Sequence, residues 1–355
     1  MPFQIIRNDI TKVKADVIVN TANPHPVVGS GTDLAIYRAA GEKRLLAARK
    51  KIGDIAPGKA VVTPAFGLSA MHVIHTVGPA WVDGHHGEKD VLRACYQNSL
   101  VLAAELKAES IAFPLIATGV YGFPKDEALN IALAEIGKFL LTHDMEVILV
   151  VFDQKAFELS SALVGEIDEY IDEHGVGLIR EAEYRGSDLR SRHSLMRLSR
   201  SARPSYGASQ ADKELSLDAM PAPMAAPFVD IKGKSLDEVL DDAGETFQQR
   251  LFKLIDESGM DDVTVYKKAN IDRKLFSRIR CKVDYKPKKI TAVAFAIALK
   301  LDMPTMLDLL SRAEIAFSPS NKFDLIITYF VTKGNYDIFE INAALFRYGQ
   351  PILGE

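Results

Sequence analysis

The sequence has few of the residues that mark secreted, metal-bound or membrane proteins. Its 355 residues include only two cysteines, Cys95 and Cys281, which lie far apart. Such spacing provides neither a disulfide framework nor a cysteine-rich zinc site, so we expect a reducing compartment and no bound metal or cofactor. The first residues lack the basic start and apolar core of a signal peptide, and no apolar run is long enough to span a membrane. These absences predict a cytoplasmic protein without membrane contact.

An excess of charge of one sign is also missing. The chain has 43 Lys and Arg residues against 47 Asp and Glu residues, a formal net charge of −4. The chain as a whole therefore does not indicate a nucleic-acid partner, although local patches can. A hydrophobic content of 48% is typical of globular proteins, and the length predicts two or three domains.

Residues 1–174 alternate between strand-like and helix-like segments. This alternation predicts an α/β fold with helices on both faces of a mixed sheet, and ligands that bind beyond the carboxyl ends of the strands. The expected strands are Phe3–Ile6, Asp16–Asn20, Ala60–Thr63, His72–Val77, Ile111–Pro114 and Val147–Phe152. The expected helices are Asp33–Ala40, Glu42–Lys51, Asp90–Glu105, Lys125–His143 and Lys155–Glu173.

The stretch from Ala15 to Gly41 contains a strand, a glycine loop and the start of a helix. Val17–Val19 is an apolar run typical of a strand buried on both faces, and the sequence Asn-Thr-Ala-Asn follows it. Glycines then break the regular structure before a helix begins at Thr32. Main-chain N–H groups at such a point favour a bound anion, and glycine lets a phosphate approach closely. The loop matches neither a P-loop nor G-x-G-x-x-G, and a plain surface turn is the structural alternative.

A second loop has the same design. The apolar run Ile111–Ile116 leads into Ala117–Pro124, which contains two glycines, and a long helix begins near Lys125. Two such loops could hold a diphosphate between them through their main-chain N–H groups. The alternative is an ordinary strand-to-helix turn.

The histidines are expected to be structural. His75 lies in an apolar strand and is predicted to be a hydrogen-bonded core residue. His85 and His86 are adjacent, so their side chains point in different directions. They also lack a cluster of further ligands, which argues against metal binding there.

The N-terminal motifs together resemble those of the macrodomain family, whose members bind ADP-ribose. The matching blocks occur in the family's order and span nearly all of residues 1–174. The resemblance implies a three-layer α/β/α macrodomain with a mixed sheet. The matching blocks are Asn8–Thr11, Asn20–Asn23, Val73–Pro79, Cys95–Leu100 and Thr118–Pro124.

The resemblance also implies roles for individual residues in binding ADP-ribose. Asp9 would accept a hydrogen bond from the adenine amine, Ile10 would lie beside the adenine, and Phe152 would pack on its face. The two glycine loops would hold the diphosphate and the distal ribose, which Tyr121 would also enclose. The remaining candidate ligand-binding residues are Asn20, Gly29, Ser30, Gly31, Thr118, Gly119, Val120 and Gly122.

Two further positions match the catalytic residues of the hydrolytic MacroD-type branch, namely Asn23 and Asp33. In that branch a water near the anomeric end of the distal ribose is polarised by the carboxylate or by a ligand phosphate. Water is a poor nucleophile, so it must be positioned and its proton accepted. The helix dipole would favour an ionised Asp33, which suits such a role. The alternative is an ordinary helix cap at Asp33.

Residues 175–244 differ in composition from the first part. Residues 180–203 contain seven arginines against three acidic residues, and a segment rich in Ser, Ala and Pro follows. Such a segment buries too little apolar surface to offset its ordering entropy. We expect a flexible, disordered linker that lets the flanking domains move independently.

Residues 245–355 are predicted to be all-helical. The order of a helix, a short helix, a basic helix beginning at Asp272 and an apolar helix over Ile290–Leu301 resembles helix-turn-helix domains of the Cro/repressor type. Between Tyr266 and Lys289 there are ten Lys and Arg residues against two Asp residues. This charge favours a DNA contact, for which the candidates are Arg273, Lys274, Ser277 and Arg278. A protein-interaction module is the alternative.

The sequence therefore supports two hypotheses. In the first, the chain is an enzyme that removes mono-ADP-ribose from a modified macromolecule or deacylates acyl-ADP-ribose, and its C-terminal module targets it to nucleic acid or a partner. In the second, it is a non-catalytic ADP-ribose sensor coupled to a DNA-binding domain. Asn23 and Asp33 favour the enzyme. Ser30 within the glycine run, and Tyr37 where the family commonly has a histidine, favour the sensor.

Overall fold

The computed structural model of this chain describes residues 2–152, 159–174 and 244–354. The expected linker, apart from Gly244, and the start of the helix expected from Lys155 lie outside the described residues. The strands are β1 (Phe3–Arg7), β2 (Val17–Thr21), β3 (Ala60–Pro64), β4 (His72–Thr76), β5 (Ser110–Pro114) and β6 (Glu146–Val151). The helices of this part are η1 (Ile10–Lys12), α1 (Thr32–Ala40), α2 (Glu42–Ile52), α3 (Glu88–Glu105), α4 (Lys125–Thr142) and α5 (Ser161–His174).

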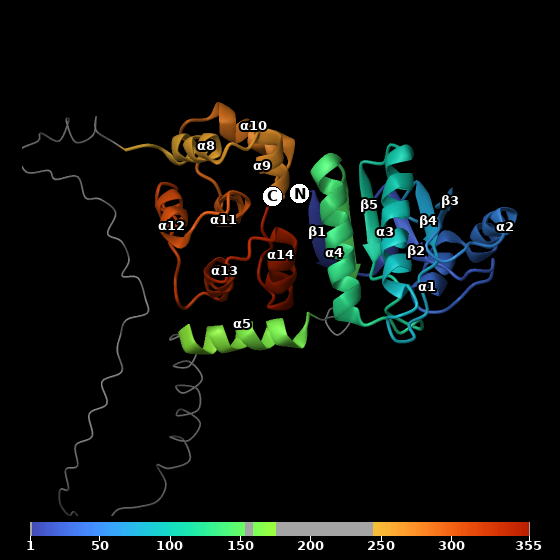
Figure 1. Cartoon of the computed structure of the whole chain (residues 1–355). Coiled ribbons are helices and arrows are strands. Elements are labelled where there is room, and N and C mark those ends of the chain that lie inside the picture. Colours follow the sequence, from blue (N-terminus) through green and yellow to red (C-terminus); the bar gives the residue numbers. More distant parts are fainter. Residues whose placement is uncertain (1, 153–158, 175–243, 355) are drawn as a thin grey trace, which may run out of the picture.

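The six strands form one mixed sheet in the order β1-β6-β5-β2-β4-β3 (Figure 1). All neighbouring pairs are parallel except β3 and β4, which are antiparallel. The predicted mixed sheet is therefore confirmed. Because β1, β6, β5 and β2 are consecutive and parallel, their carboxyl ends lie along one edge of the sheet, where ligands of such folds bind.

Helices cover both faces of the sheet. On one face Ile36 of α1 and Leu45 of α2 pack with Ile18 and Val73 of the strands. On the other face α3 and α4 pack against strand residues that include Phe113, and they also contact each other. The alternate residues of each strand thus feed two separate cores, which gives the predicted three layers.

The C-terminal part is helical throughout its described residues, with a core centred on α11. The helices are α8 (Phe247–Ser258), α9 (Asp262–Lys268), α10 (Arg273–Cys281), α11 (Lys289–Ala298), α12 (Met303–Ser311), α13 (Lys322–Thr332) and α14 (Ile338–Arg347). Every residue from Thr291 to Ala298 is buried, as expected for the apolar segment. In the ranges that the structure describes, no helix combines the length and the apolar character needed to cross a membrane.

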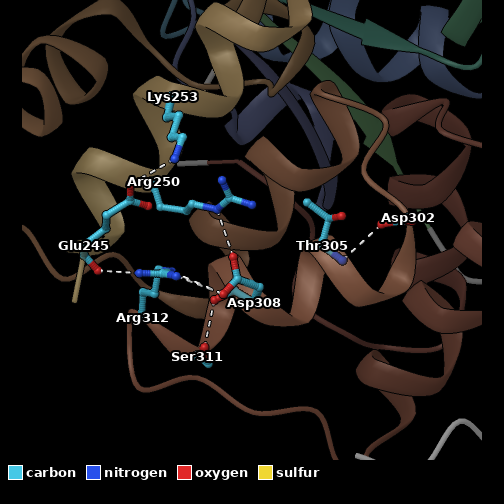
Figure 2. Close-up of polar contacts among 8 residues, drawn as sticks. All are labelled: Glu245, Arg250, Lys253, Asp302, Thr305, Asp308, Ser311 and Arg312. Atoms are coloured by element: carbon cyan, nitrogen blue, oxygen red, sulfur yellow. Dashed lines mark hydrogen bonds and ion pairs between the residues drawn. The ribbon is translucent and has the colours of Figure 1, made fainter. Parts of the chain in front are cut away.

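Polar contacts fix α8 against α12. Figure 2 shows Arg250 of α8 reaching Asp308 of α12, with 2.8 Å between Nε and Oδ2. The other carboxylate oxygen, Oδ1, accepts hydrogen bonds from Arg312 at 3.1 and 3.3 Å. Arg312 in turn donates to the main-chain oxygen of Glu245 at 2.9 Å. Asp308 and Arg312 together therefore tie α12 to α8 and to the residue before its N-cap.

The helical part packs directly on the sheet, so the independent movement expected of the two parts is wrong for the described residues. The side chain of Asn270 accepts a hydrogen bond from the N–H of Phe3 at 2.8 Å and donates to its carbonyl oxygen at 3.0 Å. The ring of Phe339 packs edge-on against Phe3. One apolar core runs without interruption from the sheet through α4 into the C-terminal helices. The edge strand β1 is thus covered, which removes a hazard for aggregation.

Candidate ADP-ribose site and basic helix

The structure brings the predicted ADP-ribose residues to one edge of the sheet. Asp9 follows β1, Phe152 follows β6, Thr118 lies after β5, and Asn20 lies in β2 near its end. These four strands are consecutive in the sheet, so the candidate adenine residues and the two glycine loops lie side by side at their carboxyl ends. The arrangement matches the elongated shape of a dinucleotide-like ligand laid across strand ends.

At the adenine end, Asp9 is held as the N-cap of η1. Its Oδ1 accepts hydrogen bonds from the N–H of Thr11 at 3.0 Å and from the Thr11 hydroxyl at 2.7 Å. The Thr11 hydroxyl is the main reason why the pKa of Asp9 is lowered. Ile10 is buried in the core, whereas Phe152 is 75% exposed. An ionised carboxylate and an exposed ring beside it are the groups that would recognise an adenine amine and an adenine face.

In the first loop, the carboxylate of Asp33 ties the loop to the strand. It accepts a hydrogen bond from the Asn20 side-chain nitrogen at 2.6 Å and another from the N–H of Gly29 at 2.6 Å. The N-cap of α1 is Gly31, with a positive φ of 58° and no side-chain cap. The helix-cap alternative for Asp33 is therefore wrong. The carboxylate instead fixes the glycine loop whose amides would face a diphosphate.

Burial, not the helix dipole, dominates the ionisation of Asp33. The residue is only 3% exposed, and this burial raises the pKa of its carboxyl group. The hydrogen bonds from Asn20 and Gly29 and the positive charge of Arg49 act in the opposite direction. The expectation that the dipole decides the charge of Asp33 is corrected accordingly.

A buried polar network lies beneath this loop. Asn20 is fully buried, and its side-chain nitrogen also lies 3.1 Å from Nδ1 of His75. On its other side, Nε2 of His75 lies 2.9 Å from the hydroxyl of Thr63. The prediction that His75 is a hydrogen-bonded core residue is confirmed. These hydrogen bonds connect Asp33 through Asn20 in β2 and His75 in β4 to Thr63 in β3. Asn20 therefore supports the loop from below.

Asn23 lies half-buried in the segment that follows β2. Its side-chain oxygen accepts a hydrogen bond from the N–H of His25 at 3.1 Å. Its main-chain oxygen accepts a hydrogen bond of 3.4 Å from Arg49, a buried residue of α2. Sequence reasoning missed Arg49, because it stands with Lys50 and Lys51 in a basic last turn that is typical of a solvated helix end.

The second loop is a compact turn that faces the first. Ala117 has a positive φ of 63°, and the N–H of Gly122 donates to the carbonyl of Gly119 at 3.0 Å. The N–H of Trp81 donates to the carbonyl of Tyr121 at 2.8 Å, which anchors the loop to the segment after β4. Burial, and then the nearby Asp33, raises the pKa of Tyr121. Because β2 and β5 are neighbouring parallel strands, the loops that follow them lie side by side.

The candidate nucleic-acid residues lie elsewhere. Arg273, Lys274, Ser277 and Arg278 are all exposed on α10, as predicted. Four contacts neutralise other cations of the basic stretch: Lys267 with Asp144, Arg280 with Asp262, Lys286 with Glu314, and Lys289 with Asp324.

The basic helix lies at the far end of the sheet from the candidate ADP-ribose site. The turn before α10 contacts Phe3 at the start of β1, and Lys267 pairs with Asp144 just before β6 begins. These are the amino ends of the two strands, whereas Asp9 and Phe152 follow their carboxyl ends.

Comparison with known proteins identifies relatives of the N-terminal part. The Macro domain family profile matches residues 19–132. An O-acetyl-ADP-ribose deacetylase of Cronobacter turicensis is 43% identical over 172 residues, which are 47% of this chain and 98% of that protein. One of Klebsiella pneumoniae is 48% identical over 158 residues, 43% of this chain and 90% of that protein. A solved Oceanobacillus iheyensis macrodomain with ADP is 37% identical with a TM-score of 0.42, covering 46% of this chain and 90% of that one.

Proposed function

The chain belongs to the macrodomain family, and from this premise we propose that residues 1–174 form an ADP-ribose-binding enzyme. It is an enzyme of the ADP-ribosyl hydrolase or acyl-ADP-ribose deacylase type. It removes mono-ADP-ribose from a modified macromolecule or cleaves an acyl group from ADP-ribose. In this proposal, residues 245–355 form the targeting module and residues 175–244 form the linker. The proposed location is the reducing cytoplasm.

One observation carries this proposal. Asp33 holds Gly29 of the first loop by a 2.6 Å hydrogen bond, and the second loop follows β5, the neighbour of β2 in the sheet. The group proposed for catalysis thus anchors one candidate diphosphate loop beside the other. Relatives that are more than 40% identical over almost their whole length are named O-acetyl-ADP-ribose deacetylases.

The proposed mechanism divides the work between a binding frame and a hydrolytic pair. Main-chain N–H groups of the loops stabilise the diphosphate, and Asp9 with Phe152 selects adenine. Asn23 orients the attacking water at the distal ribose, and Asp33 accepts its proton or holds the loop that positions it. Cleavage forms a bond from the water oxygen to the acyl or anomeric carbon and breaks the bond to the leaving group, which takes up a proton.

The test uses O-acetyl-ADP-ribose and a mono-ADP-ribosylated protein as substrates. We expect the full chain to release acetate or ADP-ribose, and the Asn23→Ala and Asp33→Ala variants to lose about 100-fold in kcat/KM or more. Calorimetry with ADP-ribose, run on the same samples, shows whether each variant still binds. The absence of ADP-ribose binding by the folded parent protein would refute the proposal as a whole.

The burial of Asp33 favours one alternative, a sensor that binds without turnover. A carboxylate that is 3% exposed, with both oxygens already accepting hydrogen bonds, is poorly placed to reach a water in the unbound state. The sensor predicts binding of ADP-ribose by calorimetry and no release from either substrate. That result would retain the binding site and exclude the enzyme.

For the C-terminal module we propose a helix-turn-helix contact with duplex DNA through α10. Arg273, Lys274 and Arg278 are exposed and form no ion pair within the described residues, so their charge is available to phosphates. Neutralising Arg273 and Lys274 together should weaken DNA binding. It should also reduce the slope of log Kd against log salt concentration by about 2, one for each lost phosphate contact. The matched control neutralises Lys43 and Lys50, exposed on α2. Equal DNA binding by the two double variants would defeat the assignment.

A further inference from the structure

Arg49 is a buried cation to which the proposed reaction assigns no role. It lies in the last turn of α2 and is only 1% exposed. Its guanidinium donates to three main-chain oxygens: Gly53 at the end of its own helix, Pro24 at 3.2 Å and Asn23 at 3.4 Å. A buried guanidinium is costly unless its N–H groups are satisfied, so this geometry is specified rather than incidental.

The segment that carries Asn23 is held from two sides, and Arg49 provides one of them. On the strand side, the N–H of Ala22 donates to the carbonyl of Thr76 in β4 at 2.8 Å. On the helix side, Pro24 accepts from the N–H of Ile55 at 2.9 Å as well as from Arg49. The carbonyl of Asn23 itself is held only by Arg49 among the described residues. Loss of that bond would free the peptide group next to the proposed catalytic side chain.

The charge of the same guanidinium also lowers the pKa of Asp33, against the larger effect of burial. Asn20 from β2 donates to this carboxylate, which in turn raises the pKa of Tyr37 in α1 and of Tyr121 in the second loop. None of these three carries positive charge, and the other side chain of the network, His75, is neutral because its burial lowers its pKa to about 3. Arg49 is therefore the cation of this cluster.

We propose that Arg49 is a positioning residue for the hydrolytic reaction, because its fork fixes the main chain of Asn23 and Pro24. This inference rests on the proposed function, because it gives Arg49 no role apart from positioning the proposed catalytic Asn23. The fork requires arginine. Lysine keeps the charge but offers a single nitrogen, which cannot reach three carbonyl oxygens with the same geometry.

The experiment compares Arg49→Lys, Arg49→Met and the parent protein, with Lys50→Met as the matched control on the exposed side of the same helix. A displacement of about 1 Å at a catalytic group can cost 100-fold, so we expect kcat to fall by about 10- to 100-fold in both Arg49 variants. The KM, and the ADP-ribose affinity from calorimetry, should change by less than about threefold, because none of the hydrogen bonds of Arg49 goes to a residue proposed to bind the ligand. Lys50→Met should match the parent.

The pH profile separates the positioning of Asn23 from the effect of the Arg49 charge on the pKa of Asp33. Removing a positive charge beside a carboxylate raises its pKa, so the acid limb of kcat/KM should move to higher pH in Arg49→Met. Arg49→Lys keeps the charge and should retain the limb of the parent while showing the lower kcat. If Arg49 only stabilised the fold, neither the acid limb of the pH profile nor the ratio of kcat to KM would change.

The outcomes are distinct. Parent-like kcat in a folded Arg49→Lys or Arg49→Met overturns the proposal, and so does loss of the cooperative thermal transition in both, which would make Arg49 a folding residue. An inactive parent protein that still binds ADP-ribose refutes the proposed function instead. A kcat loss with unchanged binding in Arg49→Lys supports the positioning role even where Arg49→Met does not fold.

Discussion

Lowering the pH should destabilise the N-terminal domain through one buried histidine. His75 is fully buried, with Asn20 on one ring nitrogen and Thr63 on the other. Because the Asn20 nitrogen is a donor, Nδ1 of His75 must accept, and the proton of the neutral ring lies on Nε2, facing Thr63. A second ring proton would face the Asn20 donor and have no acceptor. Burial, and then the charge of Arg49, lowers the pKa of His75 to about 3.

The sign and size of the effect follow from linkage. The unfolded chain titrates this histidine near 6.5, so between pH 6.5 and about 3 the unfolded state binds more protons than the folded state. Stability contributed by the neutral ring is therefore present above pH 6.5 and is lost as the pH falls through this window. Between pH 7 and pH 5 the loss from His75 alone is about 2 kcal/mol.

Urea unfolding of the parent, His75→Asn and His85→Asn at pH 7, 6 and 5 measures this loss. His85→Asn is the control, because that histidine is exposed in the loop before α3. Titration of the groups other than these two histidines is common to all three proteins and cancels in the comparison of slopes. We expect the free energy of unfolding to fall by about 2 kcal/mol less in His75→Asn than in the parent, whatever its absolute stability. Parallel pH slopes for the parent and His75→Asn would refute the reasoning.

Three further predictions test the second loop, the packing of the two parts and the contact between α8 and α12. Gly122→Ala should lower the free energy of unfolding, measured by thermal denaturation, by about 1 kcal/mol because φ of Gly122 is +66°. Gly119→Ala should change that free energy by less than about 0.5 kcal/mol. Asn270→Gly should keep the backbone at φ +55° and still cost about 3 kcal/mol, since it orphans buried main-chain groups; an unchanged melting temperature would contradict this. Asp308→Ala should cost about 1–2 kcal/mol in urea unfolding by leaving Arg250 unpaired, and Asp308→Asn should cost less.

Much of the fold could be predicted from the sequence, because local patterns determined it. The run Val17–Val19 is fully buried in a central strand, as a continuous apolar run predicts. The apolar stretch from Ile290 formed the core of the helical part for the same reason. Both glycine loops also stand where a strand ends and a helix begins, as their turn residues indicated.

The residues that sequence reasoning missed depend on partners far along the chain. Arg49 is typical of a solvated basic turn, and only the fold reveals its contacts with the carbonyl oxygens of Asn23 and Pro24, which are 26 and 25 residues away. Asn270 reads as a turn residue, yet it bonds Phe3 across 267 positions. No period or propensity encodes such contacts, because the same side chains satisfy a surface position equally well.

The docking of the two parts has a consequence for the proposed substrate. The basic helix α10 adjoins the amino ends of β1 and β6, and the candidate adenine residues follow their carboxyl ends. A five-residue strand rises about 3.3 Å per residue, so roughly 16 Å separates its two ends. The two sites thus lie at opposite ends of the strands. Because Asn270 and Phe339 hold the helices on β1, α10 cannot turn toward the candidate ADP-ribose site without breaking that interface. Under the proposed roles, DNA bound to α10 therefore locates the enzyme, and the ADP-ribosylated acceptor enters from the other end of the sheet.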